Sequence, residues 1–118
     1  MEDQKPNLIR DLTFAFALSI MNYAEELEGN RKFVVANQVL KSGTSIGASV
    51  REAQGAESKA DFIHKLKIAY KEAEETEYWL LLCSKAESYP AIGNRLNEIA
   101  SIKRVLGKII SSARGNKT

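Results

Sequence analysis

The sequence predicts an all-α protein, an up-and-down antiparallel four-helix bundle that forms one domain over residues 1–118. Three observations support this fold class. Apolar residues recur at helical spacing, breaks near Gly29, Gly55 and Pro90 divide the chain into four stretches, and no segment is typical of a strand. Short connections between long helices make neighbouring helices antiparallel. A chain of 118 residues leaves no room for a second domain, and 44% hydrophobic with 27% charged residues is ordinary for a globular protein.

The first helix is expected over residues 7–27, because an apolar stripe runs through it and Glu28-Gly29-Asn30 has the composition of a turn. We expect Gly29 to take the left-handed conformation that ends a helix. The second helix is expected over residues 31–53 and breaks near Gly55. The predicted core residues of these helices are Ile9, Leu12, Phe16, Ile20, Tyr23 and Leu27, followed by Val35, Val39, Ile46 and Val50.

The third helix is expected over residues 58–87. Its start has the spacing of a capping box, in which the Ser58 hydroxyl accepts a hydrogen bond from the Asp61 amide. The fourth helix is expected over residues 90–113, because proline suits the first helical turn. The predicted core residues here are Phe62, Leu66, Ala69, Ala73 and Leu80, followed by Ile99, Ile102, Leu106 and Ile109.

A second group of apolar residues, Phe14, Leu18 and Met21, lies on the side of the first helix opposite its core stripe. Single apolar residues on a surface are normal and need have no role. Three of them at helical spacing form a patch of the kind that a neighbouring subunit covers. We therefore expect a homo-oligomer with these three residues in its interface.

The second helix contains a run of small residues from Ser42 to Ser49 with two glycines, each of which costs a helix about 1 kcal/mol relative to alanine. Small side chains let helix axes approach closely, and the hydroxyls of Ser42, Ser45 and Ser49 can bond to a backbone carbonyl one turn earlier or to a polar group on a facing helix. A phosphate-binding loop is the alternative, but the Gly-x-x-x-x-Gly-Lys-Ser/Thr pattern is absent. Close helix packing is the preferred interpretation.

Three runs of residues carry a family resemblance. They are Ser42-Gly-Thr-Ser-Ile-Gly-Ala-Ser-Val-Arg-Glu-Ala53, Ala56-Glu-Ser-Lys-Ala-Asp-Phe-Ile-His-Lys-Leu66 and Lys71-Glu-Ala-Glu-Glu-Thr-Glu-Tyr-Trp-Leu80. Over nearly its whole length, and most strongly from Ser42 to Leu82, the chain resembles the bacterial four-helix-bundle proteins called 23S rRNA intervening-sequence or ribosomal-protein-like proteins. One departure is Ser49, where the family usually has Asn.

The resemblance implies an up-and-down bundle that assembles into a five-membered ring, a homopentamer. The family takes its name from genes that lie inside insertions in ribosomal RNA genes, and this location specifies no activity. A related bundle is the accessory protein of diversity-generating retroelements, where it resembles a basic ring that engages a reverse transcriptase and nucleic acid. The resemblance thus implies binding of nucleic acid or protein and supplies no catalytic residues.

Positive charge is concentrated in the second and fourth helices, although the net charge is only +2. Arg104 and Lys108 are four residues apart and point away from Leu106, so they form one exposed ridge. A ring would repeat this ridge, and several subunits could then act on one RNA or DNA molecule. The candidate nucleic-acid-binding residues are Arg104, Lys108, Lys103, Arg95, Arg114 and Lys41.

An alternative to nucleic-acid binding remains open, in which the cations serve the fold and its solubility. The cations near the end of the fourth helix also favour the helix dipole, and a charged surface keeps any protein soluble. On that view the protein is an interaction scaffold or accessory subunit whose ring engages a protein partner, and the basic helices bind nothing.

No enzyme activity, cofactor or metal is expected. Glu52, Glu72 and Glu75 could meet near the bundle interior, but glutamates in such helices are more often solvated. Asp61 and His64 have the spacing of half a di-iron site, yet such a site takes a histidine from each of two helices and His64 is the only histidine. No Ser-His-Asp or Cys-His arrangement is expected either, because His64 alone would have to serve it and no strand-to-helix turn presents a nucleophile.

Cys83 lies in an apolar run and is expected to be a small buried side chain, and a single cysteine agrees with a reducing compartment. Tyr70, Tyr78 and Trp79 could stack on bases, although aromatic residues at helical spacing more often fill a core or an interface. We expect a cytoplasmic protein without a membrane partner, because residues 1–6 lack the apolar core of a secretory signal and no apolar run approaches the length of a membrane span.

Overall fold

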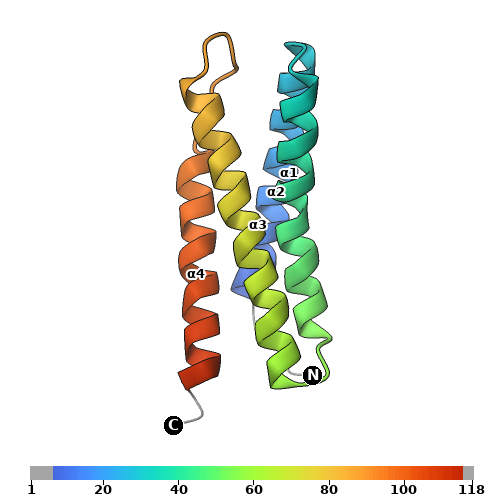
Figure 1. Cartoon of the computed structure of the whole chain (residues 1–118), viewed down its shortest axis with the longest axis vertical. Helices are drawn as coiled ribbons and strands as arrows, with labels where there is room; N and C mark the ends of the chain where they lie inside the picture. The colour runs from blue at the N-terminus through green and yellow to red at the C-terminus, as the bar shows by residue number, and fades with distance from the viewer. Residues whose placement is uncertain (1–6, 116–118) are drawn as a thin grey trace.

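The computed structural model describes residues 7–115, which form four helices joined by short connections (Figure 1). These are α1 (Leu8–Gly29), α2 (Phe33–Gln54), α3 (Lys59–Lys85) and α4 (Arg95–Gly115). Successive helices run antiparallel, and both α1 and α3 pack against α2 and α4. Within the described residues, α2 and α4 are diagonal to each other and their backbones do not approach closely. The predicted all-α, up-and-down four-helix bundle is confirmed.

The core consists of the apolar stripes that periodicity predicts. Most of the predicted residues are buried, among them Phe16, Leu66 and Leu106. Four of them lie only partly buried at the edge of the core: Leu12, Val35, Phe62 and Ile109. In the last turns of α4, Ile110 is the buried residue instead. Among residues 7–115, no helix combines the length and the apolar character that a membrane crossing requires.

The helix starts and ends follow local hydrogen bonding, and the end of α1 differs from expectation. The Ser58 hydroxyl accepts from the Asp61 amide at 3.0 Å, as predicted for the start of α3. Gly29, however, stays inside α1, and the left-handed residue is Arg31 with a φ of 64°. The Lys32 amide there donates to the Leu27 carbonyl at 2.8 Å, so the chain reverses after the glycine rather than at it.

The fourth helix begins later than its predicted range of 90–113, because it runs from Arg95 to Gly115. Pro90 lies in the connection, where its carbonyl accepts a hydrogen bond from the Tyr23 hydroxyl at 2.8 Å. Gly93 then takes a φ of 63°, a left-handed conformation that a helix cannot contain. The chain therefore completes its reversal before α4 can start.

Candidate nucleic-acid interface

The ridge predicted on α4 lies on the outside of the bundle. Arg104 and Lys108 are both exposed, whereas Leu106 between them is fully buried. Because the two cations are one helical turn apart, they stand on the same side of α4. Neither forms an ion pair with another residue in the range 7–115. Both charges are therefore open to an anionic ligand.

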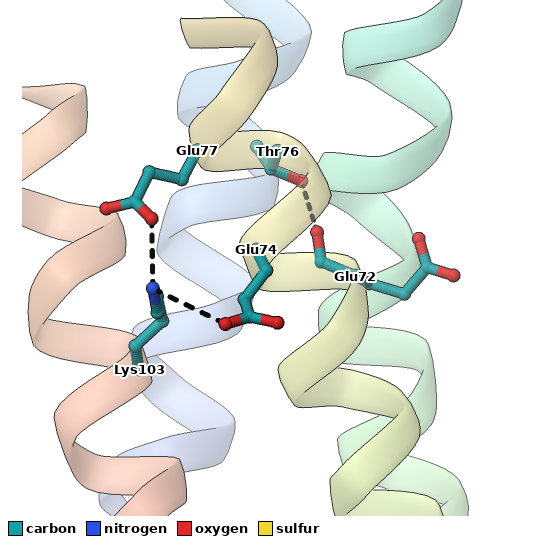
Figure 2. Close-up of polar contacts among 5 residues, drawn as sticks. All are labelled: Glu72, Glu74, Thr76, Glu77 and Lys103. Carbon is teal, nitrogen blue, oxygen red and sulfur yellow. Dashed lines mark hydrogen bonds and ion pairs between the residues drawn. The ribbon is translucent and has the colours of Figure 1, made fainter. Parts of the chain in front are cut away.

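Lys103 points toward α3 instead of outward, as Figure 2 shows. Its Nζ lies 2.9 Å from Glu77 Oε1 and 4.0 Å from Glu74 Oε2. The hydrogen bond and charge of Glu77 raise the pKa of Lys103 above its ordinary value, against the opposing effect of burial. This predicted binding residue is thus neutralised by acidic residues of its own chain.

Arg95 is also held within the fold. Its Nε lies 2.9 Å from Ser19 Oγ, and its Nη2 donates to the Ser19 carbonyl at 2.9 Å. The guanidinium lies 4.9 Å from the centroid of the Tyr23 ring, a cation–π contact. Arg95 therefore joins the first turn of α4 to α1. Its Nε and Nη2 groups, which could otherwise bind a phosphate, are engaged with Ser19.

The remaining two predicted cations lie in different parts of the bundle. Lys41 is exposed on α2, the helix diagonal to α4, so the structure separates it from the ridge. Arg114 is exposed in the last turn of α4. The fold therefore places Arg114 on the same helix as Arg104 and Lys108, and Lys41 on the diagonal helix.

A groove of about 700 Å³ opens between α3 and the second half of α4. Its apolar part is formed by Tyr70, Gly107 and Ile110, and the cations that line it are Lys67, Lys71 and Arg114. A Cβ atom at Gly107 would lie 4.0 Å from Tyr70 Cε2, so the missing side chain at this position leaves the groove open. Sequence reasoning missed this feature. The spacing of Lys67 and Lys71 is visible in the sequence. The alignment of α3 along α4 that places Gly107 beside Tyr70 is set only when the two helices pack together.

The predicted apolar patch on α1 is exposed in the single chain. Phe14, Leu18 and Met21 retain 55%, 49% and 47% of their accessible surface. The guanidinium of Arg51 on α2 lies 5.9 Å from the centroid of the Phe14 ring and covers that ring only in part. These three side chains form an apolar patch that the bundle itself does not bury.

The run of small residues on α2 serves close packing, as predicted. A Cβ atom at Gly43 would lie 2.8 Å from Cγ2 of Ile20 on α1, so any larger residue here would force Ile20 to shift. Toward α3, the buried Ser42 hydroxyl lies 2.8 Å from Thr76 Oγ1, and Thr76 also donates to the Glu72 carbonyl at 2.8 Å (Figure 2). The Ser45 hydroxyl donates to the Lys41 carbonyl one turn earlier.

The three glutamates do not meet in the interior. Glu52 is exposed and lies 3.5 Å from Lys65 Nζ, Glu75 is exposed, and Glu72 is half-buried. Burial raises the pKa of Glu72, and the charge of Glu75 adds to this effect. His64 is exposed on α3. Among residues 7–115, no three His, Cys, Asp or Glu side chains come together as metal ligands.

Cys83 is buried, and burial raises the pKa of its thiol, so the reactive thiolate is disfavoured. Of the aromatic residues considered for base stacking, Tyr78 is 59% exposed and meets the half-buried Trp79 edge to face. Tyr70 is half-buried in the groove between α3 and α4. The three aromatic residues therefore do not form one stacking surface.

Comparison with known proteins agrees with this architecture. Residues 6–108 match the 23S rRNA-intervening sequence protein family. A crystal structure of a protein of unknown function from the S23 ribosomal protein family of Bacteroides thetaiotaomicron is 45% identical to the chain, with a TM-score of 0.82. That match covers 86% of this chain and 97% of the other. No curated protein matches the chain at a significant level. The chain therefore belongs to the 23S rRNA-intervening sequence protein family.

Proposed function

We propose that the protein is a non-enzymatic homo-oligomer, a pentameric ring, which binds RNA or DNA through the exposed cations of α4. One observation carries the proposal. Arg104, Lys108 and Arg114 are exposed and form no ion pair with another described residue, whereas Lys103 and Arg95 are held by contacts within the fold. Cations that the fold does not use for its own stability are available to phosphates.

The apolar patch on α1 supports the oligomeric part of the proposal. In a monomeric bundle the patch stays exposed to solvent at Phe14, Leu18 and Met21. A second copy of the chain is a partner that is always available to cover it. A few cations on one subunit bind a phosphate backbone weakly, because each contact releases few counterions. Several subunits that engage one nucleic acid convert these weak contacts into a useful affinity.

Charge reversal on α4 tests the binding function. The double variant R104E/K108E is compared with R31E/K85E, which changes the charge equally at exposed positions between α1 and α2 and at the end of α3. Fluorescence anisotropy with a labelled RNA or DNA is measured between about 50 and 200 mM salt. We expect R104E/K108E to lose binding and the steep salt dependence, while R31E/K85E keeps both. Equal binding by the two variants, or binding that salt does not weaken, would contradict the proposal.

A second candidate function, engagement of a protein partner, is favoured by apolar residues at one end of the bundle. α2 begins and α3 ends there, on the side away from the C-terminal half of α4 (Figure 1). The exposed side chains are Phe33, Val34, Tyr78, Leu81 and Leu82. If the protein is an interaction scaffold, R104E/K108E retains partner capture and an L81E variant loses it.

A further inference from the structure

The groove between α3 and α4 combines an apolar recess with unpaired cations, and the ridge on α4 lies beside it. Its volume of about 700 Å³ falls within the range of ligand pockets, about 300 to 1,000 Å³. Tyr70 gives this recess an aromatic ring, and Gly107 places no side chain beside the Cε2 edge of that ring. A recess of this kind suits a flat, partly apolar group such as a nucleobase.

The charges around the groove fit a phosphate backbone. Lys67, Lys71 and Arg114 are exposed, and none forms an ion pair with another residue of the described chain. No acidic residue is among the described residues that line the groove. Glu74 and Glu77, farther along α3, are engaged with Lys103 (Figure 2). The described residues that line the groove therefore contribute positive charge and no negative charge.

The groove is continuous with the ridge on α4. Ser111 lines the groove, and it follows Lys108 by three residues and Arg104 by seven. Residues three, four and seven apart share one side of a helix. A nucleic acid strand that leaves the groove past Ser111 thus meets Lys108 and Arg104 in turn.

The geometry points to a preference for single-stranded nucleic acid, with an unpaired base in the groove against Tyr70 and its flanking phosphates on Lys67, Lys71 and Arg114. This inference rests on the proposed function and specifies the form of nucleic acid that is bound. A duplex keeps its bases paired and stacked, so it offers the groove nothing but phosphates. A single strand presents its bases to an aromatic surface.

The test compares labelled oligo-U RNA and oligo-dT DNA with a duplex of equal length, by fluorescence anisotropy on the full chain. We expect single strands to bind roughly tenfold more tightly than the duplex, in keeping with the contribution of one base contact. The variant G107L fills the groove without a change of charge, and it should lose this preference while its binding of the duplex stays the same. Binding of both single strands or of one alone supports the inference and shows whether RNA, DNA or both are accepted.

A second variant guards against misfolding of G107L. In K71Q/R114Q both altered side chains are exposed, and K85Q is the matched control at an exposed lysine outside the groove. Binding of single strands should fall more in K71Q/R114Q than binding of the duplex does, and K85Q should behave as wild type. Equal affinity for single strands and duplex, or an undiminished preference in K71Q/R114Q, overturns the inference while the proposed function stands. Failure to bind any probe overturns both.

Discussion

Two glycines inside helices have opposite surroundings, and this difference gives a direct prediction. A Cβ atom at Gly43 would meet Cγ2 of Ile20 at 2.8 Å, whereas one at Gly107 would meet nothing closer than 4.0 Å. Alanine gains about 1 kcal/mol over glycine in a helix, and overpacking of a core costs about 1–3 kcal/mol. We predict that G43A lowers the free energy of unfolding by about 1 kcal/mol and that G107A raises it by about 0.5–1 kcal/mol. Urea denaturation measures both, and stabilisation by G43A would contradict close packing of α1 on α2.

Glu72 gives a prediction about pH. Burial and the neighbouring Glu75 raise the pKa of Glu72 above the ordinary value of 4.5, so its ionised form is less favourable in the folded chain than in the unfolded one. At a pH above the folded-state pKa of Glu72, its ionisation therefore lowers the free energy of unfolding. At a pH below its unfolded-state pKa, this destabilisation disappears. We predict that E72Q is more stable than wild type at pH 7 and that this gain vanishes near about pH 4. Urea denaturation at several pH values measures the free energies of unfolding, with E25Q as a control at an exposed position. A stabilisation of E72Q that does not change with pH would contradict a raised pKa of Glu72.

At the scale of residues, the sequence predicts which side chains are charged but not which charges are already used. The sequence predicts Arg95 and Lys103 as binding cations because both belong to a basic helix. The partner of Arg95 is Ser19, and the partner of Lys103 is Glu77 on the facing helix. Both contacts depend on how far the helices are shifted along one another. Local periodicity carries no information about that shift.

The start of α4 depends on Arg95. Its guanidinium donates a hydrogen bond to the Ser19 carbonyl and lies within hydrogen-bond distance of the Ser19 hydroxyl. The same group lies over the ring of Tyr23. We predict that R95M lowers the free energy of unfolding by about 1.5–3 kcal/mol, as for other hydrogen bonds to a charged group. R95K should recover little, because a lysine lacks the planar fork of donors. R104M, at an exposed position, should stay within about 0.5 kcal/mol of wild type. Thermal unfolding that gives R95M and R104M equal stability would show that Arg95 does not anchor the helix.

Whole elements were predictable where their causes are local. The four helices and their buried stripes follow from spacing, and the Ser58 hydroxyl caps α3 as its sequence indicates. The beginning of α4 was not predictable from Pro90. The connection before it turns through left-handed residues at Ser88 and Gly93, and the Tyr23 hydroxyl on another helix holds the Pro90 carbonyl. Such a reversal depends on tertiary contacts.

At the scale of the whole molecule, the exposed cations of α4 and the apolar patch on α1 lie on different helices. The apolar patch on α1 was predictable, because an excess stripe on a helix is visible in its periodicity. The groove between α3 and α4 was not, because it requires Tyr70 and Gly107 to lie side by side. The proposed ring would bring several copies of the α4 cations together. We therefore propose that oligomerisation through the patch on α1 makes nucleic-acid binding effective.

Sedimentation velocity with a labelled single strand tests this claim most directly. The variant L18E places a charge in the exposed patch on α1, and A60E places the same charge at an exposed position on α3. We predict that wild type and A60E sediment as an oligomer that carries the strand with it. L18E should sediment as a folded monomer that leaves the strand free, because a desolvated charge opposes association. A wild-type protein that sediments as a monomer, or an L18E monomer that binds the strand as tightly as wild type, would contradict the account.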